Sequence, residues 1–405
     1  MKTLLKELSE KYENYKEDNL HSDFITHNEL KNKILRLKES KNFAINEIGK
    51  SVQGREIYSI RFGKGKRKIL AWSQMHGDEP TATTALFDII NFFQNENDLT
   101  EIKNEILNEL EIHFIPMLNP DGAEKYKREN SFNIDLNRDA IEFQSDESKL
   151  LWDYAQNLKP EFAFNLHDQN SYYAVGRNKK TAALSFLAPP IDYVKSINYT
   201  REKSMQLIAL IFDHLDEIIP GHIARYKDDY EPRAFGDNLM KSGISTILIE
   251  SGYYPDDEKK DFVRKLNFVS IILSLYAITK EKYKNIFYSK YFEILENNEL
   301  FFDLLLKNLT LNYNFRKFEV DIAINRIKKL NIKSMSFYYE SKIAAIGDLS
   351  IFYGIEEKDL SSCEINFDEN LSVDSDANFM IYQNSIPVYE VKSGFLFKTS
   401  WQKFF

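Results

Sequence analysis

Short apolar segments of strand length constrain the fold of this chain more than any other feature. Examples are Ile69–Trp72, Phe162–Leu166 and Ile244–Ile249, each followed by polar or turn-forming residues. A strand that is apolar on both faces has to be covered on both faces, which is typical of parallel or mixed sheets packed between helices. We therefore expect an α/β fold: a mixed, mostly parallel sheet with helices on both faces.

Segments with helical periodicity lie between these strands and place the elements along the chain. We expect helices at about 2–15, 28–38, 81–93, 146–157, 200–216 and 257–279, and strands at 43–48, 56–62, 68–74, 110–117, 162–166 and 245–249. The α/β domain then occupies residues 1–285.

The chain changes character beyond Tyr288. A Phe/Leu-rich stretch near 289–307 is interpreted as helical, and strand-like pieces follow at 317–324, 334–339, 363–367, 379–382 and 387–392. Clusters of turn residues such as 374–378 separate these pieces. We expect a small β-rich accessory domain over residues 286–405. Its sequence contains no cluster of residues typical of a catalytic or metal site. Support of the first domain, oligomerisation and substrate gating are therefore all open as its role.

Charge and cysteine content narrow the class of protein. The net charge of −9 opposes a general nucleic-acid or anionic-membrane surface, because phosphate binding needs clustered positive charge. Charged residues interrupt the apolar positions of the first eighteen residues, unlike a secretory signal. The single cysteine, Cys363, excludes an internal disulfide. We expect a cytoplasmic protein that binds neither nucleic acid nor membrane.

The sharpest local signal is QMHGDEP, residues 74–80, in which His76 and Glu79 directly follow an apolar strand. Open α/β sheets bind ligands outside the carboxyl ends of their strands. Zinc accepts nitrogen and oxygen ligands, and a catalytic zinc site takes three from the protein. Because a lone HxxE is a weak signal, a third ligand is required.

His167 is the best candidate for the third ligand, because it ends the apolar strand 162–166 and thus projects at the same kind of edge. A satisfied strand-end histidine is the alternative. The other five histidines fit structural or exposed positions: His21 and His27 in the polar lead-in, His113 within a strand, His214 in a helix and His222 near a turn.

Further motifs lie between and after these residues in a fixed order. Asn-Pro-Asp-Gly occupies residues 119–122, Arg128 follows, Asp-Leu-Asn-Arg occupies 135–138, and Glu250 closes the strand 247–249. Together with HxxE and His167, this order resembles the zinc carboxypeptidases of the carboxypeptidase A type, and the compact bacterial branch in particular. The resemblance covers roughly residues 40–280.

The resemblance implies a role for each matching residue. It implies a zinc metallocarboxypeptidase that hydrolyses the C-terminal peptide bond of a peptide with a free terminal carboxylate. The implied set comprises the ligands His76, Glu79 and His167 of one zinc ion, Asp135 as the carboxylate that orients a ligand histidine, Arg128 for the oxyanion, Asn137 and Arg138 for the terminal carboxylate, and Glu250 as general base.

This chemistry is coherent without the family. Zinc lowers the pKa of its water to about 7, a neighbouring carboxylate can move the proton, and a cation stabilises the developing oxyanion. For Glu250 alone, a strand-end surface carboxylate is the alternative.

Three positions depart from the family pattern or stay open. The tyrosine that caps the substrate is assigned to Tyr230, with Tyr226 as the alternative. Asp168 stands where the digestive enzymes have Ser, and it could adjust the metal, contact a substrate amine or act as a capping residue. The charged segment 226–236 could set specificity or be a solvated loop. Its candidates are Arg225, Lys227 and Arg233 for an acidic side chain, and Asp228, Asp229 and Glu231 for a basic one.

Two other functions use the same motifs. A deacylase of the succinylglutamate desuccinylase or aspartoacylase type would share the HxxE…His core. A non-catalytic binding module would have lost a ligand or Glu250, and all four residues are present. The accessory domain also suggests a homo-oligomer as an expectation.

Overall fold

The computed structural model describes residues 1–96, 98–366 and 371–399, and the chain divides into two compact units. Unit 1 consists of residues 1–170 and 180–297, and unit 2 of residues 171–179 together with 298 onward. Unit 1 thus ends at Asn297, and the segment 171–179 groups with unit 2. The domain division at residue 285 stays a prediction.

Unit 1 is built on an eight-stranded sheet with the order β1-β2-β4-β3-β5-β9-β7-β8. The four central strands β4, β3, β5 and β9 are parallel, whereas β1, β2 and β7 join their neighbours towards the centre in antiparallel fashion. The strands are β1 (Ala44–Lys50), β2 (Glu56–Phe62), β3 (Arg67–Trp72), β4 (Leu110–Ile115), β5 (Phe162–Asp168), β7 (Leu184–Leu187), β8 (Ile223–Arg225) and β9 (Ser245–Ser251). This confirms the mixed, mostly parallel sheet.

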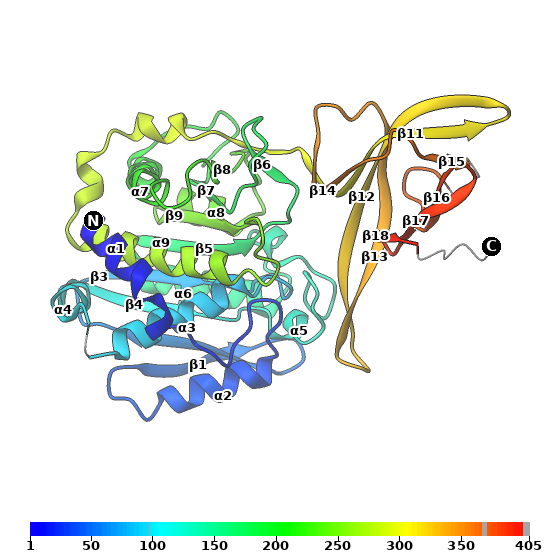
Figure 1. Cartoon of the computed structure of the whole chain (residues 1–405). Helices are drawn as coiled ribbons and strands as arrows, with labels where there is room; N and C mark the ends of the chain where they lie inside the picture. Colours follow the sequence, from blue (N-terminus) through cyan, green and yellow to red (C-terminus); the bar gives the residue numbers. More distant parts are fainter. Residues whose placement is uncertain (97, 367–370, 400–405) are drawn as a thin grey trace. The chain divides into compact units, whose positions relative to one another are not determined.

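Helices cover both faces of this sheet (Figure 1). They are α1 (Lys2–Glu10), α2 (His27–Leu37), α3 (Thr81–Gln94), α4 (Thr100–Glu109), α5 (Pro120–Ala123), α6 (Asp146–Leu158), α7 (Tyr199–Leu215), α8 (Phe235–Lys241) and α9 (Asp261–Thr279). Short 3₁₀ turns lie at Tyr12–Asn14, Leu136–Arg138, Lys282–Asn285 and Tyr288–Glu293.

The apolar strands divide their side chains between two cores, as strand alternation requires. Phe162, Phe164 and Leu166 of β5 pack in the larger core, with α3, α7 and α9. Ala163 packs on the opposite face in a second core that includes Trp72 and residues of α6 and α8. The sheet is buried on both sides, so its parallel centre can be wholly apolar.

Helix α9 is long and apolar enough to cross a membrane by length and composition alone. In unit 1, however, 83% of its apolar window is buried inside the protein. It packs against α3, α7, α1 and α4, so it serves as a core helix of this unit.

Unit 2 is β-rich, as expected. A main sheet has the order β13-β12-β11-β15-β16-β17-β18 with β14 added beside β11, and a two-stranded sheet joins β10 and β6. The strands are β6 (Tyr173–Val175), β10 (Asn297–Glu299), β11 (Phe301–Tyr313), β12 (Arg316–Asn331), β13 (Ser336–Gly347), β14 (Tyr353–Asp359), β15 (Glu364–Asn366), β16 (Phe379–Gln383), β17 (Ile386–Lys392) and β18 (Phe395–Lys398). Phe367, in one expected strand, lies outside the described residues.

The expected helix at 289–307 is wrong. Only a 3₁₀ turn forms at Tyr288–Glu293, and the Phe/Leu-rich run becomes the central strand β11. Leu304 and Leu306 pack into one core of unit 2, while Leu305 packs into another. A segment buried on both faces has no alternation, so periodicity could not separate strand from helix. No element was predicted at α4 or β7.

Candidate metal centre and active site

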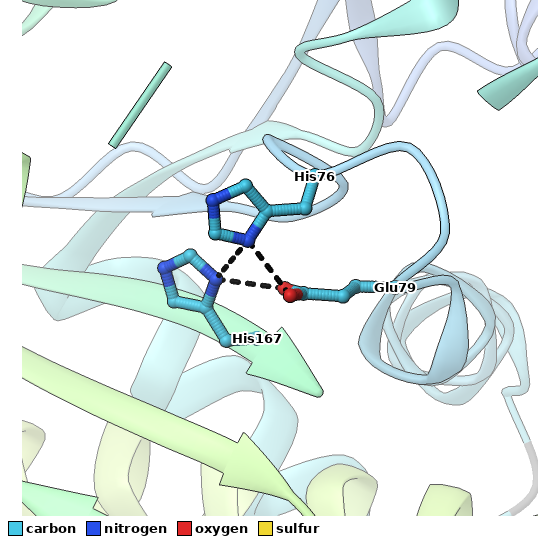
Figure 2. Close-up of side chains that lie close together, drawn as sticks. All are labelled: His76, Glu79 and His167. Carbon is cyan, nitrogen blue, oxygen red and sulfur yellow. Dashed lines mark hydrogen bonds and ion pairs between the residues drawn. The ribbon is translucent and has the colours of Figure 1, made fainter. Parts of the chain in front are cut away.

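Three side chains converge at the carboxyl ends of β3 and β5. His76 lies in the loop after β3, Glu79 lies just before α3, and His167 is on β5. Figure 2 shows them pointing at one another. The Nδ1 of His76 lies 2.7 Å from Glu79 Oε1, the Nδ1 of His167 lies 2.8 Å from Glu79 Oε2, and the two Nδ1 atoms are 3.2 Å apart.

This arrangement fits a tetrahedral zinc site. Bonds of about 2.0–2.1 Å to the metal would place the ligand atoms roughly 3.3 Å apart. The two Nδ1 atoms, at 3.2 Å, match this spacing, whereas the Glu79 oxygens lie closer, at 2.7 and 2.8 Å, and would move apart to admit the ion. All three residues are buried, and in the described part of the chain they form the one group of three or more His, Cys, Asp or Glu residues suited to a metal ion. The donor set of two imidazoles and one carboxylate is that of a catalytic zinc site.

The tautomer of His76 supports the same conclusion. Asp135 Oδ1 lies 3.0 Å from His76 Nε2, a contact that holds a proton on Nε2 and leaves Nδ1 as the atom that would bind a metal. Burial opposes ionisation of Asp135, but His76 and Arg128 outweigh it and hold the pKa of Asp135 well below its ordinary value.

Charge within the triad is complementary. Burial disfavours a charged Glu79, yet the two histidines outweigh this and hold the pKa of Glu79 well below its usual range. Burial also lowers the pKa of His167, which favours the neutral imidazole that binds a metal. Burial opposes a charged His76, but Glu79 and Asp135 outweigh it and raise the pKa of His76 to about 9. Without a metal ion the site is therefore an ionised carboxylate between a cationic and a neutral imidazole, and binding a metal displaces the proton from His76.

The Asn-Pro-Asp-Gly run shapes the ligand loop. Asn119 donates from Nδ2 to the carbonyls of Met75 and Arg128, at 3.3 and 3.2 Å. A Cβ on Gly77 would lie 2.1 Å from the backbone carbon of Gly122, so a glycine at position 77 is needed for these backbones to approach. The run is thus a scaffold that fixes His76 and Arg128, and it is not itself a ligand.

Glu250 lies one strand away from the ligands. In the parallel pair of β5 and β9 it is the register partner of His167, so the two side chains project at the same edge. It is 9% exposed. Burial, and then the nearby carboxylate of Glu79, raises the pKa of Glu250 to about 8.

Arg128 contacts the ligands from the loop between α5 and the 3₁₀ turn at Leu136–Arg138. Its Nη1 lies 3.1 Å from His76 Nδ1 and 3.2 Å from Glu79 Oε1, and its Nε donates to Asp135 Oδ2 at 3.1 Å. Asp135 therefore orients a ligand and this cation together.

Asn137 and Arg138 lie on the 3₁₀ turn that follows Asp135. The Oδ1 of Asn137 accepts from the backbone N–H of Phe235 at 3.0 Å, which leaves its Nδ2 as the group that can donate to a ligand. Arg138 donates to the carbonyl of Asn137 at 2.8 Å and pairs with Glu231 at 3.4 Å. The guanidinium is partly exposed.

Comparison with known proteins agrees with this geometry. Residues 33–182 match the family described as zinc carboxypeptidase. Over this part of its length the chain is similar to the zinc carboxypeptidases. Among curated relatives, Carboxypeptidase SOL1 of Arabidopsis thaliana is 33% identical over 106 residues, which are 25% of this chain and 22% of that protein. Carboxypeptidase E of Caenorhabditis elegans is 28% identical over 176 residues, 38% of this chain and 35% of that protein. The matches thus span about a third or less of these relatives.

Solved carboxypeptidase structures share the fold. A metallo-carboxypeptidase from Burkholderia cenocepacia has a TM-score of 0.52 at 13% identity, over 64% of this chain and 70% of that one. Carboxypeptidase A from Helicoverpa armigera has a TM-score of 0.50 at 16% identity, over 68% and 78%.

Tyr230 lies beside Glu231, the partner of Arg138, and its ring packs edge-on against Tyr193 at 4.9 Å. Tyr226 follows β8, and its backbone N–H donates to the carbonyl of Phe186. The choice of Tyr230 as the substrate cap of this zinc carboxypeptidase fold stays a prediction.

The charged segment 226–236 is largely paired within unit 1. Asp228 is buried and accepts from Lys195 and Arg201, each at 2.8 Å. Arg233 pairs with Glu231 through two bonds of 2.9 Å, and Arg225 pairs with Glu296 at 2.6 Å. These charges hold the loop together, so the idea that they meet a substrate side chain gains no support from the geometry.

The carboxylate of Asp168 is not part of the metal-binding group. Its Oδ2 accepts from Thr81 Oγ1 at 2.5 Å and from Lys260 Nζ at 3.2 Å. These contacts fit a structural role for Asp168 better than contact with the metal or with a substrate amine. No local pattern predicts the partner Lys260, because it is far from Asp168 in the chain.

The other histidines that the sequence set aside make structural contacts where bonds are observed. His113 Nδ1 lies 2.7 Å from the hydroxyl of Tyr154, and its Nε2 lies 3.0 Å from Glu111. His222 Nδ1 lies 2.8 Å from the carbonyl of Thr181. Neither belongs to the metal group.

Proposed function

We propose that this chain is a zinc metallocarboxypeptidase that hydrolyses the C-terminal peptide bond of its substrate. The observation that carries the proposal is the convergence of His76, Glu79 and His167 with Glu250, the register partner of His167 on the adjacent strand. A ligand triad with an adjacent carboxylate provides the components of metal-assisted hydrolysis.

A zinc ion held by the triad would supply Lewis acidity, lowering the pKa of water at the metal to about 7. Glu250 would accept the proton from that water on its carboxylate and deliver it to the leaving amine. Burial raises the pKa of Glu250, whereas a cation at the triad opposes this shift, so the carboxylate becomes available as a base when metal is bound.

Arg128 and the 3₁₀ turn would hold the substrate. The guanidinium of Arg128 is fixed by Asp135 next to the ligands, where it can donate to a carbonyl oxygen as negative charge develops. Asn137 Nδ2 and Arg138 would bind the terminal carboxylate, a task suited to a planar guanidinium. Tyr230, beside Glu231, is our candidate for the residue that closes over the substrate.

The first experiment measures zinc content and cleavage of a mixed peptide library by the full chain, with Glu250→Gln beside it. The expected result is one zinc per chain in both proteins and products shortened by one C-terminal residue for the wild type alone. Mass spectrometry of the products also identifies the preferred residue. Stoichiometric zinc without peptide cleavage by the wild type contradicts the proposal. A parallel panel of N-acyl amino acids then tests the deacylase alternative, and inactivity on both panels favours a binding module.

We also propose a cytoplasmic location and a homo-oligomer formed through unit 2. The lone Cys363, which is buried and free, suits a reducing compartment. Exposed apolar side chains in unit 2, among them Phe315 and Ile332, support self-association. Cell fractionation checks the first idea, and light scattering of the intact chain after gel filtration checks the second.

A further inference from the structure

The side chain of Lys260 joins the ends of the two strands that carry His167 and Glu250. Its Nζ donates to Asp168 Oδ2 at 3.2 Å and to the carbonyl of Ser251 at 3.0 Å. A third, longer bond reaches the carbonyl of Gln169 at 3.4 Å. An ammonium group has three donors, so these three contacts account for all of them.

These contacts lie at the last rung of the ladder between β5 and β9. The paired residues there are His167 with Glu250 and then Asp168 with Ser251. The N–H of Gln169 also donates to the carbonyl of Ser251 at 3.0 Å. Lys260 therefore adds a side-chain link to the backbone bonds at the end of this ladder, one step beyond the proposed base and the third ligand.

Asp168 extends the same connection to the second ligand. Its backbone N–H donates to Glu79 Oε2 at 3.2 Å, which fixes the orientation of that carboxylate. Its own carboxylate accepts from Thr81, the first residue of α3 and two residues beyond Glu79. One ion pair thus links the segments of Glu79, His167 and Glu250.

The backbone conformation at position 260 suggests that a lysine is present there for the contacts of its side chain. Its φ is +56°, in the left-handed region that disfavours residues with a Cβ, and it precedes the first residue of α9. Its side chain makes no capping bond to that helix. Glycine would adopt this positive φ at lower energetic cost. The bonds that the lysine side chain makes at the strand ends offset that cost.

We propose that Lys260 and Asp168 form a clamp that positions Glu250 and the ligands Glu79 and His167 relative to one another. The inference rests on the proposed function for the role of Glu250, but its effect on metal binding does not. Neither residue donates to the substrate, so both are positioning residues.

The test compares Lys260→Met, Asp168→Asn and the double variant with the wild type. Lys159→Met is the matched control, because Lys159 is exposed and also has a left-handed backbone, with φ +52°. Three quantities are measured on the full chain: zinc affinity by chelator competition, kcat and KM on the best peptide, and the thermal midpoint of the metal-free protein.

Each single variant is expected to weaken zinc binding or kcat by about 10- to 100-fold, as residues that orient ligands do. KM should stay within about twofold, because substrate contacts are intact. The double variant should lose no more than the worse single variant, since both changes break one unit.

A lowered thermal midpoint with wild-type zinc affinity and kcat would overturn the clamp, and so would losses that multiply in the double variant. If the wild type cleaves no peptide, the proposed function fails, but the zinc affinities of the variants still test the clamp. Weaker zinc binding by Lys260→Met then supports the clamp, and unchanged binding refutes it.

Discussion

Removing the Asp135 carboxylate tests the metal centre most directly. Asp135 accepts from His76 Nε2 at 3.0 Å, from Arg128 Nε at 3.1 Å and from the backbone N–H of Asn137 at 2.9 Å. One side chain therefore sets the tautomer of a ligand, the position of a cation and the start of the 3₁₀ turn. We expect its loss to appear in zinc affinity before it appears in folding.

Two substitutions separate geometry from charge. Asp135→Asn keeps an acceptor oxygen for His76 but removes the negative charge, whereas Asp135→Ala removes both. Loss of such a partner costs about 10- to 100-fold in metal affinity, and each tenfold is about 1.4 kcal/mol. Charge-assisted hydrogen bonds are roughly twice as strong as neutral ones. We expect Asp135→Asn near the lower end of this range and Asp135→Ala near the upper end.

The assay is competition for zinc against a fluorescent chelator at fixed pH and salt. Asp153→Asn serves as the control, because Asp153 is exposed and makes only a surface pair with Lys149. The thermal midpoint of each metal-free variant shows whether the fold survives. A zinc affinity for Asp135→Ala equal to that of the wild type, with the fold intact, would refute the reasoning that Asp135 orients His76.

Three further predictions follow from buried contacts of unit 1. Gly77→Ala should destabilise by about 1–3 kcal/mol or more, because its Cβ would collide with the backbone of Gly122, and chemical denaturation checks this. Arg264→Met should cost about 3–5 kcal/mol, because it strands the buried carboxylate of Asp88, and a thermal midpoint unchanged from the wild type would contradict this. Burial raises the pKa of Asp237 from 3.8 to about 7, so its stabilising contribution is complete below pH 3.8 and is lost as pH rises through 7. Asp237→Asn should therefore raise the free energy of unfolding more at pH 8 than at pH 5 in urea titrations, and an equal gain at both pH values would count against it.

Local pattern was enough to place much of the candidate site. Strand β5 was predicted because Phe162–Leu166 is short and apolar. His167, which directly follows this segment, was the candidate for the third ligand. His76, Glu79 and His167 then converge as expected. The roles of Glu250, Arg128, Asn137 and Arg138 remain predictions, although the structure brings each of them to this edge of the sheet or the adjoining turn.

Long-range partners could not be predicted in the same way. Glu231 pairs with Arg138 and Lys260 pairs with Asp168 across about ninety residues of chain, and no local period relates them. The Phe/Leu-rich run at 301–313 was misjudged for a related reason. It is the centre of a sheet, and the partners that decide this lie on other strands.

The α/β class, the ligand set and the order of the motifs can be predicted from local pattern, because apolar strands and short ligand spacings are local properties. Which charges are free to act depends on the three-dimensional fold. Asp228 and Arg225 looked available in the sequence, but each is neutralised by a partner that is distant in the chain, Arg201 and Glu296 respectively. Asp168 likewise turned from a candidate metal or substrate contact into part of an ion pair. Charge pairing depends on distance in space, and the fold alone sets that distance.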